Sequence, residues 1–256
     1  MANHYDLKGK KILITGSNGR LGSAYVKALL HNGAFVYTSD IQKSMDATFE
    51  KELTQKALTQ YEYLTIDVTS EDSLNRAREK IGPVDVLINN AGAKGVKGPF
   101  EERLAADIDH VLSVQLKGVI LCSKVFSKNM IEKRSGKIIN IASIYGSAAP
   151  DKRIYDDPAK INSEVYGATK AGVIQFTKYL ATYLGEYKII VNCVSPGGVT
   201  HAGQSETFIK NYSARTPLGR MATPEDLIGI ICFLSSDDAN YINGQNIVVD
   251  GGLTAW

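Results

Sequence analysis

Tyr166 and Lys170 are two side chains of complementary chemistry that stand four residues apart in a stretch with helical periodicity. Positions i and i+4 lie side by side on one face of a helix. A phenol has a pKa of about 10, too high for a good base at neutral pH, and a neighbouring ammonium favours the phenolate and so lowers that pKa. The pair therefore predicts a general acid/base, Tyr166, that is tuned by Lys170.

A Tyr-x-x-x-Lys pair alone is weak support for catalysis, because such pairs occur by chance on many helices. Here two further polar sites follow predicted strands, Asn89–Gly92 and, one strand later, Ser143. Taken singly, Ser143 could be a strand-end cap and Tyr166 an ordinary aromatic residue. Their order and context favour a catalytic site.

A glycine-rich segment, Thr15–Gly22 with the sequence TGSNGRLG, lies between the first predicted strand and the first predicted helix. Glycines there allow a sharp turn and let backbone N–H groups approach a pyrophosphate at the positive end of the helix. The alternative is a glycine-rich turn that holds no ligand. The strand–turn–helix context favours dinucleotide binding, with contacts expected from Gly16, Asn18, Gly19, Arg20, Leu21 and Gly22.

Asp40 follows the second predicted strand, 18 residues after Gly22. This is close to the spacing of about 20 residues at which a carboxylate binds the adenosine ribose hydroxyls. A 2′-phosphate would meet the negative charge of Asp40, so NAD is the expected cofactor, while Arg20 and Lys43 leave NADP as the less favoured one. Alternatively, Asp40 caps the next helix.

Asp67 and Val68 follow the third predicted strand. They could hold the adenine edge through a carboxylate and a backbone N–H. An N-cap role for the adjacent Thr69 or Ser70 is an equal alternative.

Short apolar runs alternate with segments of helical period, and these runs predict the elements that position the polar side chains. Several runs are nearly continuous in β-branched residues, as in strands buried on both faces. With helices between them, the strands must be mostly parallel, in a doubly wound α/β sheet of about seven strands with helices on both faces. The predicted strands are Lys11–Thr15, Ala34–Thr38, Tyr61–Ile66, Val84–Ile88, Lys137–Ile141, Ile189–Val194 and Asn246–Val249.

The 256 residues are 44% apolar and 22% charged, with a net charge of +2, which is ordinary composition for one globular domain over residues 1–256. The charge is too small to favour a nucleic-acid or acidic-membrane partner. Cys122, Cys193 and Cys232 lie in apolar surroundings, which indicates reduced core thiols and a cytoplasmic location. The sequence shows neither a signal segment nor a membrane-spanning run, and its histidines lack metal-ligand spacing, so no metal is expected.

These segments together resemble the short-chain dehydrogenase/reductase family over essentially the whole chain. The resemblance implies a Rossmann fold and hydride transfer between a nicotinamide cofactor and a secondary alcohol or ketone. It implies that Tyr166 exchanges a proton with the substrate oxygen, that Ser143 hydrogen-bonds that oxygen, and that Lys170 holds the nicotinamide ribose and lowers the pKa of Tyr166. Further residues that it places along the cofactor are Asp67, Val68, Asn90, Ala91, Gly92, Pro196, Gly197 and Val199, and the remaining matching segments are Asn140–Ser143, Asn192–Gly198, Tyr241–Gln245 and Val249–Gly252.

The sequence departs from the family pattern at three places. Arg20 stands where the second glycine of Thr-Gly-x-x-x-Gly-x-Gly is usual, which gives the glycine spacing of related sugar-nucleotide epimerases and dehydratases. Gln115 stands where a helix residue is usually Asn; it could serve a water-mediated proton relay, but it reaches farther. Ser143 and Tyr166 are 23 residues apart, a wider separation than is usual.

The extra residues form an insertion, about 147–163, beside the catalytic pocket. Charged and aromatic together, it could close over a polar substrate, whereas the alternative is a solvated loop or a subunit contact. A polar lid for the substrate is expected at about 199–215. The insertion and the C-terminal end resemble bacterial oxidoreductases of flagellin modification and surface-sugar biosynthesis. Substrate contacts are expected from Lys94, Lys152, Arg153, Tyr155 and His201, of which His201 could equally be a surface residue.

The prediction is therefore an NAD(P)-dependent oxidoreductase that interconverts a secondary alcohol and a ketone on a sugar or sugar phosphate in surface-glycan biosynthesis. The expected catalytic residues are Ser143, Tyr166, Lys170 and Gln115. One alternative is an epimerase or dehydratase that oxidises its substrate transiently, although the long C-terminal substrate domain of such enzymes is missing. Another is a dinucleotide-binding protein without chemistry. The resemblance also implies a homotetramer or homodimer, with helices around 111–130 and 166–184 in one interface and the C-terminal strand in another.

Overall fold

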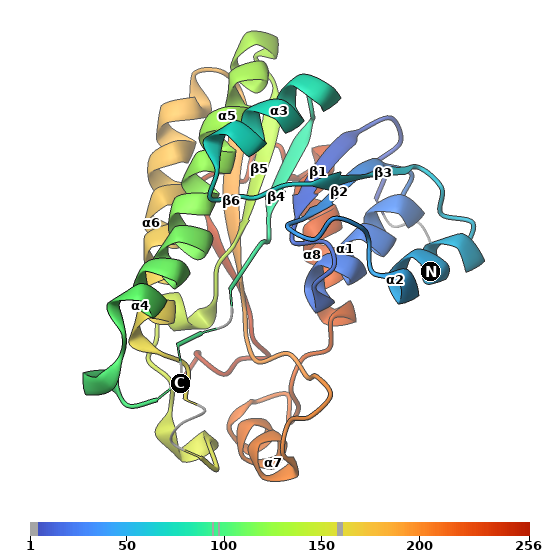
Figure 1. The fold of residues 1–256 in the computed structure, drawn as a ribbon. Coiled ribbons are helices and arrows are strands. Elements are labelled where there is room, and N and C mark those ends of the chain that lie inside the picture. Colours follow the sequence, from blue (N-terminus) through green and yellow to red (C-terminus); the bar gives the residue numbers. More distant parts are fainter. Residues whose placement is uncertain (1–4, 94, 97, 158–160) are drawn as a thin grey trace.

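A computed structural model describes residues 5–93, 95–96, 98–157 and 161–256, and its centre is one sheet of seven parallel strands (Figure 1). The strand order is β3-β2-β1-β4-β5-β6-β7. The predicted doubly wound sheet is confirmed, and every predicted strand is found, most of them with small differences at their ends. The strands are β1 (Lys11–Thr15), β2 (Phe35–Asp40), β3 (Tyr61–Thr65), β4 (Val86–Asn89), β5 (Gly136–Ile141), β6 (Ile189–Pro196) and β7 (Asn246–Val249).

Helices cover both faces of this sheet (Figure 1). The helices α1, α2 and α8 lie on one side, and α3, α5 and α6 lie on the other. Every parallel connection in the sheet can thus pass through a covering helix, as the alternation of runs predicts. The helices are α1 (Arg20–His31), α2 (Ala47–Gln55), α3 (Glu71–Ile81), α4 (Ala105–Leu112), α5 (Gly118–Lys133), α6 (Glu164–Gly185), α7 (Glu206–Arg215) and α8 (Glu225–Ser235).

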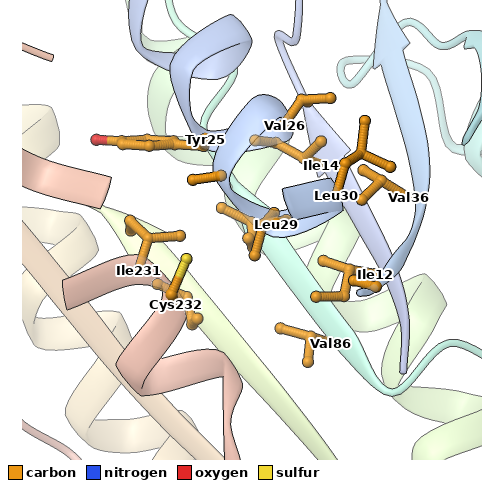
Figure 2. Packing of buried hydrophobic residues seen from close by; sticks show 14 of the residues in the cluster. Ile12, Ile14, Tyr25, Val26, Leu29, Leu30, Val36, Val86, Ile231 and Cys232 are labelled. Carbon is orange, nitrogen blue, oxygen red and sulfur yellow. The ribbon is translucent and has the colours of Figure 1, made fainter. Parts of the chain in front are cut away.

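The side chains of β1 alternate between two hydrophobic cores. Ile12 and Ile14 pack in the core beneath α1 and α8, whereas Leu13 packs in the core beneath α3, α5 and α6. Figure 2 shows the first core, where Leu29 of α1 and Ile231 of α8 approach the sheet. Because successive strand residues point to opposite faces, a strand covered on both sides must be apolar throughout. Burial of each such Leu or Ile contributes about 1.5–3 kcal/mol.

The strand order reverses between β1 and β4, since β2 and β3 lie on one side of β1 and the later strands lie on the other. Open parallel sheets bind ligands at the carboxyl ends of their strands, at such a reversal. The glycine-rich turn follows β1 there, and β4 ends beside it at Asn89. The fold therefore brings the predicted polar segments to one edge.

The insertion packs against α7, the helix of the expected lid (Figure 1). It contains a short 3-10 turn, η4 (Lys152–Ile154), whose Ile154 is buried with Tyr212 of α7. The side-chain amide of Asn211 donates to the backbone oxygen of Ile154 at 3.4 Å, and Arg215 forms an ion pair with Asp151 at 2.6 Å. The two segments thus form one packed unit.

Cys122, Cys193 and Cys232 are buried and unpaired with one another, so the prediction of core thiols is confirmed. Within the described part of the chain, no helix is both long and apolar enough to cross a membrane.

Candidate active site

The carboxyl ends of β1, β2, β4, β5 and β6 open into a cavity of about 1250 Å³. This volume exceeds the roughly 300–1,000 Å³ of ordinary small-molecule sites, as an extended dinucleotide beside a substrate requires. All residues predicted to bind the cofactor or to act in catalysis lie on its wall. The residues that the sequence predicted separately therefore belong to one continuous site.

The turn after β1 allows backbone segments to approach closely. Gly16 has a φ of +70°, and a Cβ at this position would lie 2.7 Å from Cα of Ala91. At Gly22 a Cβ would lie 2.2 Å from the backbone oxygen of Gly16. Only glycine meets these constraints. Among the described residues no side chain caps α1, so the N–H groups of its first turn remain available for an anion.

The shifted glycine pattern has a structural reason. Gly19 is the N-cap of α1, and a Cβ there would lie only 3.2 Å from the Gly16 oxygen. Position 20 is already the first helical residue, and its side chain leaves the turn. Arg20 donates from Nη1 to the backbone oxygens of Val199 at 3.0 Å and Thr200 at 2.6 Å.

Asp40 is the last residue of β2 and faces the glycine-rich turn. Its Oδ2 accepts from the backbone N–H of Asn18 at 3.1 Å, and its Oδ1 accepts from that of Ile41 at 2.9 Å. A carboxylate has about four acceptor sites, so capacity remains for ribose hydroxyls. The alternative that Asp40 caps the next helix is wrong, because Asp46 is the N-cap of α2.

Asp67 and Val68 lie on the cavity wall, as expected, but Asp67 also has local partners. Its Oδ1 accepts from the backbone N–H of Thr69 at 2.9 Å and from the Thr69 hydroxyl at 2.7 Å. The N-cap of α3 is Ser70, which confirms that part of the alternative.

Asn90 fixes the glycine-rich turn from the neighbouring strand. Its side-chain amide donates to the backbone oxygens of Thr15 at 2.9 Å and Gly16 at 3.0 Å. In return, the Thr15 hydroxyl accepts from the N–H groups of Asn90 and Ala91. Asn90 thus contributes to the cavity by holding its shape.

Ser143, Tyr166 and Lys170 meet where β5 ends beside the start of α6. The N-cap Ser163 accepts from the backbone N–H of Tyr166 at 3.2 Å, which sets Tyr166 in the first turn of the helix. The Ser143 hydroxyl accepts from the backbone N–H of Tyr145 at 3.2 Å. The Nζ of Lys170 lies 5.6 Å from the Tyr166 ring centroid and donates to the Ile141 backbone oxygen at 2.9 Å.

Burial dominates the ionisation of this group. It raises the pKa of the Tyr166 hydroxyl, an effect that the neighbouring Ser143 side chain partly offsets. Burial also lowers the pKa of the Lys170 amine to about 8. The expected lowering of the Tyr166 pKa by Lys170 is therefore wrong for the chain alone, because poor solvation disfavours the charged form of both groups.

Gln115 is buried in a single π-helical turn, η2 (Ser113–Lys117), between α4 and α5. Its Nε2 donates to the Ala93 backbone oxygen at 2.9 Å, while its Oε1 is buried without a partner among the described residues. Isolated π turns are frequent at functional sites. The amide that replaces the usual Asn thus lies on the cavity wall.

The insertion residues expected to contact the substrate do not line the cavity. Lys152, Arg153 and Tyr155 are absent from the described cavity wall. Arg153 instead pairs with Asp151 at 2.9 Å and remains mostly exposed. The hydroxyl of Tyr155 lies 3.0 Å from that of Tyr145, two residues after Ser143. Tyr155 lies near Tyr166, whose pKa it helps to raise, and its ring packs against Phe208 of α7.

Of the other expected substrate contacts, His201 does line the cavity. Its backbone N–H donates to Oε1 of Gln204 at 2.8 Å. Lys94 lies outside the described residues.

The sequence analysis missed a stripe of α4 and its C-terminal neighbour on the cavity wall. Its members follow helical spacing, which was the available signal, but the same pattern is typical of a solvated helix face. The missed residues are Ala106, Asp109, His110 and Ser113.

Comparison with known proteins defines the family. A family model described as enoyl-(acyl carrier protein) reductase matches residues 17–254. A cis-4-hydroxycyclohexanecarboxylate dehydrogenase of Sinomonas cyclohexanicum is 34% identical, over 95% of this chain and 96% of its own. A crystal structure of a short-chain dehydrogenase from Leptospira borgpetersenii with bound NAD+ has 40% identity and a TM-score of 0.86, and the match covers 97% of this chain and 94% of that one. The chain belongs to the short-chain dehydrogenase/reductase family.

The chain also resembles a protein whose structure holds NADP. A gluconate 5-dehydrogenase from Burkholderia cenocepacia, in complex with NADP and tartrate, has 27% identity and a TM-score of 0.88, with 99% of this chain and 98% of that chain covered. The chain is accordingly an oxidoreductase that uses a nicotinamide dinucleotide to interconvert an alcohol and a carbonyl compound. The close glycine contacts and the uncapped start of α1 fit such a cofactor.

Proposed function

We propose that this short-chain dehydrogenase uses NAD to interconvert a secondary alcohol and a ketone on a sugar, a sugar phosphate or a sugar acid. The observation that carries the proposal is the convergence of Ser143, Tyr166 and Lys170 on the cavity that the glycine-rich turn and Asp40 also line. When bound, the nicotinamide dinucleotide supplies the hydride acceptor or donor.

The protein's own groups would manage the proton. Tyr166 gives its hydroxyl proton to the substrate carbonyl oxygen in reduction and takes the alcohol proton in oxidation. Ser143 hydrogen-bonds the same oxygen, which holds it near the phenol. Lys170 would hold the ribose next to the nicotinamide, and its anchor on the Ile141 oxygen fixes the direction of the amine. Gln115 is retained as a candidate for the proton relay.

Asp40 supports NAD over NADP. Its carboxylate stands at the end of β2 beside the turn, where a 2′-phosphate would be repelled. Arg20, the residue that could have favoured NADP, is engaged with the oxygens of Val199 and Thr200.

The substrate class rests on relatives. One relative acts, by its name, on a hydroxylated cyclohexane carboxylate, and another on gluconate. A role in surface-glycan synthesis goes further and stays a prediction, as does a cytoplasmic location, with which the three buried free thiols agree. We also propose a homodimer or homotetramer through α5 and α6.

The first experiment would incubate the purified protein with NAD, and separately NADP, and with sugars, sugar phosphates, sugar acids, nucleotide sugars and simple secondary alcohols. Absorbance of the reduced nicotinamide reports turnover. A higher kcat/KM with NAD and a sugar derivative is expected. Preference for NADP would contradict the role given to Asp40, and tightly held, non-exchanging NAD would favour an epimerase or dehydratase.

Tyr166→Phe tests the mechanism directly. Loss of the hydroxyl removes proton transfer, so kcat should fall by about 10²–10⁴-fold while NADH still binds. Tyr241→Phe, at a fully exposed tyrosine, is the matched control and should keep wild-type turnover. Substantial activity in Tyr166→Phe would remove Tyr166 as the acid/base, and NADH binding without turnover by the wild type on the whole panel would favour a non-catalytic binder.

A further inference from the structure

Arg20 joins two parts of the cavity wall that are far apart in the sequence. It begins α1 directly after the glycine-rich turn, and its Nη1 donates to the backbone oxygens of Val199 and Thr200 at 3.0 and 2.6 Å. Arg20 and Val199 both line the cavity. The side chain therefore links the predicted pyrophosphate end of the site to the segment that leads into the lid.

Position 20 is an unfavourable place for an unpartnered cation. The N-terminus of a helix carries the positive end of its dipole, so a cation there costs about 0.3–1 kcal/mol. Partial burial of the Arg20 guanidinium also lowers its pKa. The two carbonyl oxygens offset both effects, because hydrogen bonds from a charged donor are stronger than neutral ones. Arg20 thus has a specific partner.

The partner segment is itself tied to the lid helix. The backbone N–H of Thr200 donates to the Ala222 oxygen at 2.8 Å, and that of Ala222 donates to the Gly198 oxygen at 3.0 Å. The N–H of Gly198 in turn donates to the hydroxyl of Tyr212, which is buried in α7. Displacement of Val199 and Thr200 would therefore disturb the contacts that seat α7.

We propose that Arg20 is a positioning residue that clasps the Val199–Thr200 segment across a bound dinucleotide and thereby slows its release. The clasp rests on the proposed dinucleotide site. Arg20 reaches past the turn to the lid segment, so opening of the cavity on that side requires both hydrogen bonds to break. An arginine beside a glycine-rich turn could instead bind the pyrophosphate directly, and the two roles differ in their effect on a short ligand.

The test compares NADH with ADP, which has a pyrophosphate but cannot extend to the nicotinamide end. In Arg20→Ala, stopped-flow fluorescence should show NADH dissociation faster by on the order of tenfold, equivalent to about 1.4 kcal/mol. The Kd for ADP, from calorimetry, should change less than twofold. Hydrogen exchange of the apoprotein should also quicken across 199–212. Arg20→Gln repeats the test if the alanine variant does not fold.

Lys27→Ala is the matched control, since it removes one positive charge from the same helix, α1, at a lysine that pairs with Glu52 and does not touch the clasp. It should leave NADH dissociation within twofold of wild type, and Arg20→Lys should recover only part of the loss. An equal fall in ADP and NADH affinity in Arg20→Ala would make Arg20 a phosphate ligand and overturn the clasp. An unchanged rate of NADH release in Arg20→Ala would overturn the clasp and leave the dinucleotide site standing. A wild-type protein that binds no NADH would overturn both the dinucleotide site and the clasp.

Discussion

Burial holds both Tyr166 and Lys170 towards their uncharged forms. Each would ionise to a charge that the cavity wall solvates poorly, so the pKa of the phenol rises and that of the amine falls to about 8. The tyrosine therefore keeps its proton more firmly than in water. Such a group is a ready acid for carbonyl reduction and a poor base for alcohol oxidation at neutral pH.

This asymmetry predicts opposite pH profiles for the two directions. Because burial raises the pKa of Tyr166, the protonated form dominates at pH 7, and kcat/KM for ketone reduction should stay level through neutral pH and fall only at alkaline pH. For oxidation, kcat/KM should rise by up to about tenfold per pH unit above neutral. Initial rates in both directions from pH 6 to 9.5 check this. An oxidation profile that is level from pH 6 upward would contradict it.

The buried charge of Lys170 should lower the stability of the apoprotein. The amine has its pKa lowered from the ordinary 10.5 to about 8 by burial, so burying the ammonium costs stability in full below pH 8. Between pH 8 and 10.5 the folded chain sheds the proton and the cost declines. Lys170→Met should therefore raise the free energy of unfolding at pH 7 by about 2 kcal/mol, after loss of the bond to Ile141.

Urea unfolding at pH 7 and pH 10 measures this effect, with the gain expected to shrink at the higher pH. Lys124→Met is the control, because Lys124 is half exposed and pairs with Glu71 at the surface. Its variant should differ from wild type by less than about 1 kcal/mol. A gain at Lys170→Met that is equal at both pH values would reject burial of the charge as the cause.

At the scale of single residues, the sequence predicted where side chains lie better than how they ionise. Ser143, Tyr166 and Lys170 could be selected because turn position and helical spacing are local properties. The pKa of Tyr166 could not, because it depends on desolvation by residues distant in the chain. The partner of Arg153 could not be predicted either, because the sequence does not show that its guanidinium pairs with Asp151.

The insertion and α7, the helix of the expected lid, pack together as one unit. The ring centroid of Tyr155 lies 5.2 Å from that of Phe208 in α7, and the hydroxyl of Tyr155 lies 3.0 Å from that of Tyr145, two residues after Ser143. The insertion therefore bridges the lid to the loop that carries Ser143. We propose that it governs substrate binding through the position of α7, without contact to the substrate.

Ile154→Ala tests this bridge. Ile154 is 2% exposed and packs with Tyr212, so its truncation leaves a cavity that costs about 2–5 kcal/mol locally. Hydrogen exchange should quicken in Glu206–Arg215, and KM for the substrate should rise on the order of tenfold while the Kd for NADH changes less than twofold. Ile81→Ala in α3 should lower overall stability without this effect on the lid. A normal KM in Ile154→Ala would separate the insertion from substrate binding.

The helices and strands were predicted from the periodicity of apolar residues. Where the predicted bounds differ from the structure, the difference arises where backbone pairing and apolar residues do not coincide. β1 and β7 have the predicted bounds, because their apolar runs and their backbone pairing coincide. β2 and β6 extend further, through Asp40 and Pro196, because parallel pairing continues past the last apolar residue. Nothing in the sequence indicated that η4 packs on α7, since the two segments lie far apart in the chain.

At the scale of the molecule, the topology left few possible arrangements of the strand ends. Apolar strands separated by helices require parallel pairing, and right-handed crossovers then place the carboxyl ends of β1, β4 and β5 at one edge. The common site could therefore be predicted before any distance was known. Subunit contacts could not, because the interface is a property of exposed faces that the chain's own core does not constrain.

The exposed face of α5 and α6 is the place to test assembly. Tyr179 and Tyr183 of α6 are 64% and 55% exposed, with parallel rings 6.2 Å apart, and Ile120 of α5 is 38% exposed. If this face joins subunits, Tyr179→Asp with Tyr183→Asp would bury two unpaired charges in the interface. Multi-angle light scattering should then show a smaller species, and Tyr241→Asp, outside this face, should keep the wild-type mass.

The same variants test whether assembly supports catalysis. The two tyrosines lie on the helix that begins beside Tyr166, so loss of the subunit contact should loosen α6 and reduce kcat. NADH binding should change less, because the glycine-rich turn and Asp40 belong to the other half of the sheet. A wild-type mass in the double variant would place the contact elsewhere, and a monomeric wild type with full turnover would show that the site is complete within one chain.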